Sequence, residues 1–330
     1  MPDIKSEILT ALRQSRNYIS GQDLSEQLHV SRTAVWKHIQ KLQEEGYDIE
    51  AVPNRGYRMI SCPDTIASGE VVSRMTTRWI GKDIRYFAQI DSTNQYIKRI
   101  AEEGAPEGIL AIADEQTAGR GRLGRSWSTP PKTAVAMSLL LRPTIPVERI
   151  SMVTLIMGLA ISQGCRELYP ALDVGIKWPN DAVVNGKKIS GTLTEMSTDM
   201  ESVLYIVVGT GINVNVKTFP EEIRETATSI ALELGEDQNR AQLIAVIMKH
   251  FEDNYERFLK TQDLSLLMDE YNRQLLNKGR KVRVLQPGHE YTGEALGINK
   301  MGDLLVKKEE GTVEAVYAGE VSVRGVYGYV

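Results

Sequence analysis

The stretch at residues 116–127, Gln-Thr-Ala-Gly-Arg-Gly-Arg-Leu-Gly-Arg-Ser-Trp, has the composition of an anion-binding loop. Between Gly119 and Arg125 it holds three glycines, three arginines and no acid. Glycine lets the backbone approach a ligand closely, and arginine carries a permanent charge on a planar fork that matches carboxylate or phosphate oxygens. We expect a loop that is loose when empty and closes over a negatively charged ligand. A solvated basic surface loop would have the same composition.

The glycine spacing, Gly119-x-Gly121-x-x-Gly124, also matches a dinucleotide-binding fingerprint. That fingerprint opens a helix and is followed about 20 residues later by an acid. Here the glycines lead into Ser-Trp-Ser-Thr-Pro-Pro, and the run 139–143 contains no acid. We therefore reject a dinucleotide site.

A second informative stretch, residues 175–191, contains the strong hairpin signal Asn185-Gly186. It predicts two antiparallel strands with Lys188 just beyond the turn. Pro179 is expected to end the first strand and to leave Asn180 and Asp181 outside the strand pairing. Arginines and a lysine spread developing negative charge, and a carboxylate can hold Mg²⁺, so these segments together suggest chemistry on phosphate.

A polar cluster at residues 91–94, Asp-Ser-Thr-Asn, lies between a predicted strand at 84–90 and a predicted helix at 95–103. Such side chains at the end of a strand suit hydrogen bonding to a small polar ligand. A turn that satisfies its own hydrogen bonds is the alternative, and the sequence leaves both open.

The elements that must position these groups read as a mixed α/β domain. Buried strands are predicted at 108–114, 133–141 and 203–209, the last ending in Thr-Gly-Ile-Asn at 210–213. Amphipathic or buried helices are predicted at 150–169 and 241–258. Further on, five short strands separated by glycine turns, at 281–285, 291–296, 304–306, 313–316 and 321–324, predict a small SH3-like barrel.

Composition limits the function classes. The chain has 330 residues, 42% hydrophobic and 25% charged, with a net charge of -4. No apolar run reaches the ~18 residues of a membrane span, and the start lacks a signal-peptide pattern. Cys62 and Cys165 show no metal spacing. We expect a cytoplasmic protein without a membrane partner, in which any basic patch is local.

Residues 4–45 show helix, short helix, turn and helix, and two strands follow at 47–52 and 56–60, as in a winged helix-turn-helix. Residues 1–62 carry eight basic residues and eight acids, but the stretch from Ser31 to Lys41 holds three basic residues and no acid. DNA binding is therefore expected, with protein contacts as the alternative. The neutral total favours a dimer on a two-fold operator. The expected DNA contacts are Ser31, Arg32, Thr33, Trp36, Lys37, Asn54 and Arg55.

The segments Gly119-Arg-Gly-Arg-Leu-Gly-Arg-Ser-Trp127, Lys177-Trp-Pro-Asn-Asp181 and Gly186-Lys-Lys-Ile-Ser-Gly191 closely resemble the signatures of biotin protein ligases. The preceding winged helix resembles the bifunctional type that also represses the biotin operon. The resemblance implies an α+β chain of three domains: a winged helix-turn-helix at 1–62, a central mixed α/β ligase domain at 63–275, related to class II synthetase-like and lipoate ligase folds, and an SH3-like C-terminal domain at 276–330.

By this resemblance, biotin and ATP with Mg²⁺ give biotinyl-5′-adenylate, whose biotin passes to a lysine of the biotin carboxyl carrier protein. The implied catalytic residues are Arg120, Arg122 and Lys188. The implied biotin contacts are Ser92, Thr93, Asn94, Gln116, Arg120, Gly121, Arg122, Lys188 and Gly191. The implied nucleotide contacts are Arg122, Arg125, Trp127, Asn180, Asp181, Asn213 and Arg324, with Asp181 also the candidate Mg²⁺ ligand and Glu320 a further polar position. Some members of the family have another arginine at the position of Leu123. The resemblance therefore does not extend to how tightly the loop holds the intermediate.

The resemblance also implies that the adenylate acts as corepressor, promoting a homodimer that binds operator DNA. Two other functions stay open from the residues: a regulator that senses an anion without catalysis, and a ligase for another acid such as lipoate.

Overall fold

The computed structural model describes residues 4–15, 17–199, 202–286, 288–318, 322–325 and 329–330. The chain divides into two compact units. One contains residues up to Thr76 together with Asn239–Ala245, and the other contains Thr77–Gln238 and Val246–Val330. The three-domain division at 1–62, 63–275 and 276–330 follows sequence and function, and it remains a proposal.

The first unit has the predicted winged helix-turn-helix order. Helices α1 (Ile4–Gln14), α2 (Gly21–Leu28) and α3 (Arg32–Glu44) precede strands β1 (Asp48–Val52) and β2 (Gly56–Ser61), and α4 (Ser68–Val72) follows. Ser31 caps α3, because its Oγ accepts the Ala34 N–H at 3.2 Å. The apolar faces of the helices and wing form one core, made by Ile8, Leu9, Leu12, Leu24, Val35, Ile39, Leu42, Tyr47 and Ile49.

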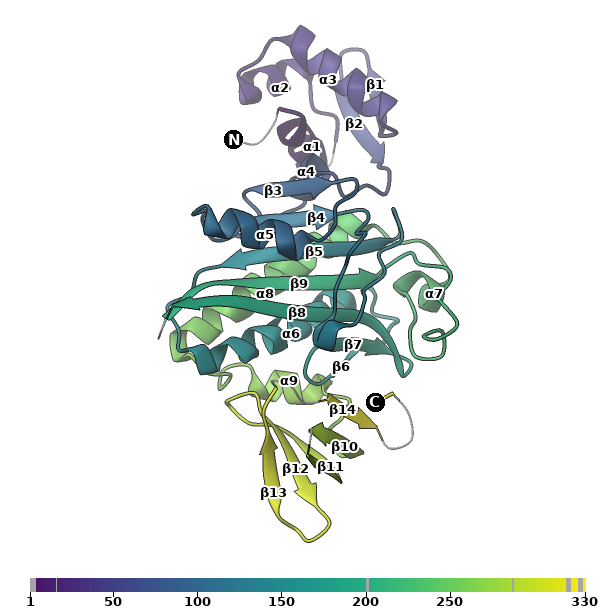
Figure 1. Cartoon of the computed structure of the whole chain (residues 1–330). Helices are drawn as coiled ribbons and strands as arrows, with labels where there is room; N and C mark the ends of the chain where they lie inside the picture. Colours follow the sequence, from purple (N-terminus) through teal and green to yellow (C-terminus); the bar gives the residue numbers. More distant parts are fainter. Residues whose placement is uncertain (1–3, 16, 200–201, 287, 319–321, 326–328) are drawn as a thin grey trace. The chain divides into compact units, whose positions relative to one another are not determined.

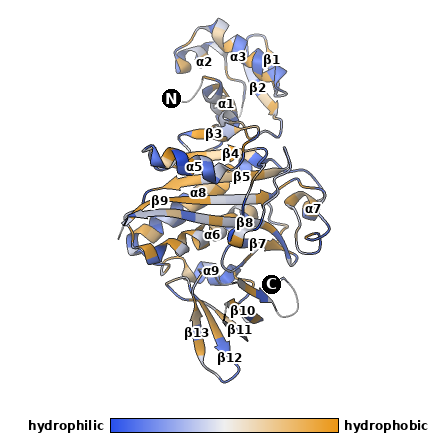
Figure 2. Cartoon of the chain, viewed as in Figure 1, coloured by the Kyte–Doolittle hydropathy of each residue, from blue (hydrophilic) through white to orange (hydrophobic). Residues whose placement is uncertain are grey.

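The second unit is built on a seven-stranded sheet in the order β3-β4-β5-β9-β8-β7-β6 (Figure 1). β3 pairs with β4 in parallel, and the other pairings of neighbouring strands that the structure describes in this sheet are antiparallel. Strands β4 and β5 and much of β9 are apolar (Figure 2), because both faces of the sheet are covered there. The strands are β3 (Ile84–Phe87), β4 (Leu110–Ala113), β5 (Ala134–Leu141), β6 (Gly175–Lys177), β7 (Asp181–Val184), β8 (Lys187–Asp199) and β9 (Ser202–Asn213).

Helices cover the two faces of this sheet. Helix α5 (Thr93–Glu102) lies in front of it in the view of Figure 1, and α6 (Ile150–Leu168) and the greater part of α8 (Arg240–Thr261) lie behind. Most residues of α6 are buried. A helix that is buried on all sides is apolar all round rather than along one face, which explains its long apolar run. The shorter elements are η1 (Arg122–Gly124), η2 (Val147–Arg149), α7 (Ile230–Leu234) and α9 (Met268–Gln274).

Three sequence predictions about local structure were wrong. Asp181 is not outside the strand pairing, because it pairs with Lys177 in β6 and with Gly191 in β8. Pro179 lies in the turn between β6 and β7 and removes no ladder hydrogen bond. Strand β9 continues to Asn213, which pairs with Ala134. Helix α5 begins at Thr93 rather than at residue 95.

The C-terminal strands agree with the sequence prediction. Strands β10 (Lys281–Gln286), β11 (His289–Ile298), β12 (Leu304–Lys308), β13 (Val313–Val316) and β14 (Ser322–Gly325) form one antiparallel sheet in the order β13-β12-β11-β10-β14. No helix within the described ranges has the length and apolar character needed to cross a membrane.

Candidate active site

A cavity of about 360 Å³ lies where the arginine loop, the β7–β8 hairpin, β9 and the start of α5 meet. Every ligand-binding residue expected from the sequence in this unit lines it: Ser92, Thr93, Asn94, Gln116, Arg120, Gly121, Arg122, Arg125, Trp127, Asn180, Asp181, Lys188, Gly191, Asn213 and Arg324. Glu320 lies outside the described residues. Segments more than 200 residues apart in sequence therefore contribute to one cavity.

One end of the cavity is polar. Its acid, Glu195, accepts a hydrogen bond from Asn94 Nδ2 at 2.7 Å and is paired with Lys98. The Thr93 backbone N–H and hydroxyl both donate to Gln116 Oε1, at 2.9 and 3.0 Å. Ser138 Oγ lies 2.7 Å from Thr93 Oγ1 and 2.5 Å from Asn94 Oδ1. Ser92 is the N-cap of α5 but makes no side-chain cap hydrogen bond. The cluster is thus a hydrogen-bonding network across three elements, not a simple helix cap.

Two glycines of β9 make room for this arrangement. A Cβ atom on Gly209 would lie 2.1 Å from Asn94 Oδ1, and one on Gly211 would lie 2.2 Å from the Trp127 indole. Real Cβ atoms do not approach other atoms so closely, so these side chains occupy the space that glycine leaves. Asn94 and Trp127 therefore pack directly against the backbone of β9.

The other end of the cavity is cationic. Lys188 Nζ lies 2.6 Å from Asp181 Oδ1 and 5.5 Å from the centre of the Trp127 ring. Arg122 donates to Asn180 Oδ1 at 3.3 Å and to the Ala318 carbonyl at 3.3 Å. Burial lowers the pKa of Arg122 from its ordinary value, although Asp181 acts in the opposite direction. Cations with few solvent contacts attract an incoming anion more strongly than exposed ones.

Sequence reasoning missed two residues of this end, Lys177 and Tyr329, which also line the cavity. Lys177 is 7% exposed, and burial lowers its pKa to about 8, while Asp181 raises it and neighbouring cations lower it further. The structure pairs Lys177 with Asp181 across the turn between β6 and β7, and paired residues point to the same face. The prediction that Asp181 lies outside the strand pairing hid this relation. Nothing in the sequence pointed to Tyr329.

The geometry gives Asp181 two partners. Its Oδ1 faces Lys188, and its Oδ2 accepts the Tyr329 hydroxyl at 2.5 Å. Within the described ranges, His, Cys, Asp and Glu residues do not gather in groups of three or more able to hold a metal ion. Asp181, the Mg²⁺ ligand expected from the sequence, is therefore engaged by Lys188 and Tyr329.

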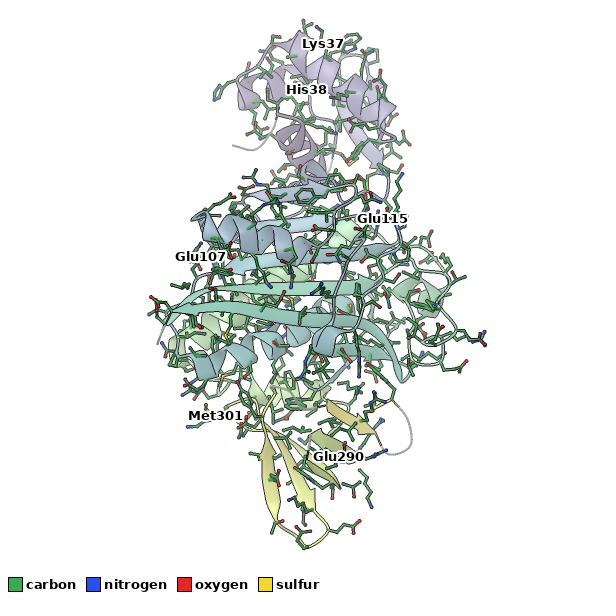
Figure 3. The ribbon with its side chains drawn as sticks, viewed as in Figure 1. Lys37, His38, Glu107, Glu115, Glu290 and Met301 are labelled. Atoms are coloured by element: carbon green, nitrogen blue, oxygen red, sulfur yellow. The ribbon has the colours of Figure 1, made fainter. Side chains whose placement is uncertain are left out.

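The first unit presents the residues expected to contact DNA on its surface. Ser31, Arg32, Thr33, Trp36 and Lys37, on and before α3, are all exposed, as are Asn54 and Arg55 between β1 and β2; Lys37 is labelled in Figure 3. The Tyr18 ring lies 4.9 Å from the Arg58 guanidinium and 5.8 Å from that of Arg55. The Tyr18 hydroxyl donates to Glu50, which also pairs with Arg58. These contacts support the wing strands.

A winged helix-turn-helix combined with a cavity that is polar at one end and cationic at the other defines a class: a regulator that contains an anion-activating enzyme. Residues 86–213 match the model of the biotin/lipoate A/B protein ligase family, residues 5–58 an HTH domain, and residues 279–324 the biotin protein ligase C-terminal domain.

Relatives are similar along nearly the whole chain. The bifunctional ligase/repressor BirA of Bacillus subtilis (strain 168) is 37% identical over 97% of this chain and 98% of its own, and that of Escherichia coli (strain K12) is 30% identical over 96% of each. The solved biotin protein ligase of Aquifex aeolicus, in complex with biotin and ATP, is 31% identical with a TM-score of 0.65, covering 74% of this chain and 99% of its own. The chain belongs to the bifunctional ligase/repressor family of biotin protein ligases. The resemblance and fold class predicted from sequence are confirmed.

Proposed function

We propose that this chain uses ATP to join biotin to a lysine of the biotin carboxyl carrier protein, through biotinyl-5′-adenylate. The observation that carries the proposal is the cavity itself. Its polar end offers hydroxyl and amide groups that suit a neutral ring with hydrogen-bonding groups, and its cationic end suits a carboxylate beside a phosphate. Relatives that are similar along nearly the whole chain are named ligase/repressors, which supports the assignment.

In the first step, an oxygen of the biotin carboxylate attacks the α-phosphorus of ATP. The bond to the bridging oxygen breaks and pyrophosphate leaves with its electron pair. Two anions must approach each other, so Arg122, Lys188 and Lys177 neutralise the repulsion and bind charge that develops on the phosphoryl oxygens. Arg120, exposed on the rim of the cavity, would complete this group when the loop closes.

Ligand contacts are assigned by position in the cavity. We propose that Ser92, Thr93, Asn94 and Gln116 bind the ring of biotin, and that Gly121 and Gly191 let the backbone approach its carboxylate chain. Trp127, Arg125, Asn180, Asn213 and Arg324 would contact the nucleotide. Because both Asp181 oxygens already have partners, we propose that Mg²⁺ enters with the phosphate oxygens of ATP as part of the substrate.

In the second step, the neutral amine of the acceptor lysine attacks the carboxyl carbon of the adenylate. An amide forms, AMP leaves, and the amine loses a proton. The chain's cations bind the leaving phosphate, so the residues that activate biotin also stabilise the departing group.

The regulatory half of the proposal is that the adenylate acts as corepressor. Ligand-induced ordering of the arginine loop would promote a homodimer, and two copies of α3 would then bind an operator with two-fold symmetry in the cytoplasm. The unpaired state of Cys62 and Cys165 agrees with a reducing compartment.

The test is incubation of a purified carrier domain with the protein, MgATP and either biotin or lipoate, followed by mass spectrometry. A gain of one biotinyl group in the biotin sample alone is the expected result. Labelling by lipoate alone would identify a ligase for another acid, and no biotin-dependent pyrophosphate release would favour a sensor without catalysis.

A further inference from the structure

We infer that Tyr329 is a positioning residue of the catalytic cavity, reaching Asp181 and Lys177 from the C-terminal segment. The inference rests on the proposed function and deepens it. Tyr329 lines the cavity, its hydroxyl donates to Asp181 Oδ2 at 2.5 Å, and the centre of its ring lies 3.7 Å from Lys177 Nζ. One side chain therefore contacts both an acid and a cation of the phosphate-handling end.

The hydroxyl acts on Lys188 through Asp181. Asp181 is 7% exposed, and its second oxygen, Oδ1, lies 2.6 Å from Lys188 Nζ. A carboxylate held at both oxygens has a fixed orientation, and so has the ammonium paired with it. Lys188 has three N–H donors, and its ion pair with Asp181 holds them in the cavity that would receive the oxygens of biotin or ATP. The tyrosine thereby fixes the lysine at the place where the two anions meet.

The ring acts on Lys177. This ammonium is almost completely removed from water and lies near other cations, among which Lys188, Arg324 and Arg125 disfavour its charge. The negative face of an aromatic ring stabilises a desolvated cation. The Tyr329 ring therefore helps to keep Lys177 charged and in place to meet a phosphate oxygen.

Steady-state biotin-dependent pyrophosphate release by the full chain tests these two roles separately. Tyr329→Phe keeps the ring and removes the hydroxyl, so kcat should fall about tenfold, the usual loss for a hydrogen bond to a charged group, while the KM for ATP stays within roughly twofold. Tyr329→Leu also removes the ring, so the KM for ATP should rise roughly fivefold or more in addition. Tyr317→Phe is the matched control, because Tyr317 belongs to the same C-terminal region but is 50% exposed and does not line this cavity.

Unchanged kcat in Tyr329→Phe would overturn the inference. A lower KM for ATP in Tyr329→Leu would also overturn it, because the ring would then be competing with the nucleotide. Equal losses in both variants with lowered thermal stability would show a purely structural role and would count against it too. Inactivity of the unmodified chain would remove the proposed function and this inference together, whereas an active chain with unaffected Tyr329 variants removes the inference alone.

Discussion

At the scale of single residues, the ion pair of Lys188 with Asp181 explains how a lysine can be ready for an anion that has not arrived. Asp181 is buried, and its negative charge compensates the positive charge of Lys188. The attraction between the two charges is stronger here than in bulk water. When a ligand carboxylate and phosphate enter, the lysine already stands in the correct place. Positioning of charge before reaction is the main source of catalysis that this cavity offers.

Removing that charge should stop adenylation without unfolding the chain. Lys188→Ala is expected to lower biotin-dependent pyrophosphate release by roughly 100- to 1000-fold, the usual cost of removing one preorganised charge stabiliser. Lys187→Ala is the control, because the neighbouring Lys187 does not line the cavity, and it should retain activity. Normal adenylate formation by Lys188→Ala would exclude this lysine from the mechanism.

Titration of Lys177 should determine how nucleotide binding depends on pH. Burial lowers the pKa of Lys177 to about 8, so the side chain is charged below that pH and becomes neutral as the pH rises through it. The value of kcat/KM for ATP reports groups of the free enzyme, and it should therefore decline above about pH 8. In Lys177→Gln the value should be lower at pH 7 and should lack this decline. A profile that is the same in both proteins would contradict the assignment.

At the scale of elements, β9 shows how a strand can shape a ligand site by lacking side chains. Gly209→Ala places a Cβ in the volume of Asn94 Oδ1, and overpacking of about 1–3 kcal/mol should weaken biotin binding by roughly tenfold or more. Gly158→Ala in α6 is the control, since its Cβ would meet Ile176 at an ordinary 3.8 Å. Isothermal titration with biotin measures both, and unchanged affinity in Gly209→Ala would contradict the role given to this strand.

The same scale shows what the sequence could and could not predict. Periodicity and turn residues were sufficient for α3, for the β7–β8 hairpin at Asn185-Gly186 and for the five C-terminal strands, because each depends on local signals. The expectation that Asp181 lies outside the ladder failed because a proline was taken as a break within a strand, while it occupies a turn. Tyr329 could not be found at all, because its contact with Asp181 spans 148 positions and depends on how the chain folds back.

The first unit makes a separate prediction for its recognition helix. Arg32→Ala should reduce operator affinity about tenfold, within the range for loss of a base or phosphate contact, and should leave adenylation unchanged. Lys41→Ala, in the last turn of α3, should have a smaller effect, because the N-terminal part of such a helix meets the bases. Gel shifts at fixed salt measure both, and equal effects would argue against this docking orientation.

At the scale of the whole molecule, the proposed function requires that one ligand take part in both catalysis and repression. The adenylate is an intermediate for acceptor labelling and a corepressor for operator binding, so the free energy of its binding must differ between DNA-bound and free states. Operator affinity should rise when biotin and MgATP are added together and not when either is added alone. A gel shift that is insensitive to these additions would leave the enzyme in place and remove the regulatory claim.

In the proposed function, one cavity, polar at one end and cationic at the other, joins biotin to AMP from ATP and then delivers biotin to a protein lysine. Mass spectrometry of a purified carrier domain, incubated with the chain, biotin and MgATP, tests it most directly. A single added biotinyl group is expected with the unmodified chain, and almost none with Lys188→Ala. An unlabelled carrier domain in the presence of all three components would contradict it.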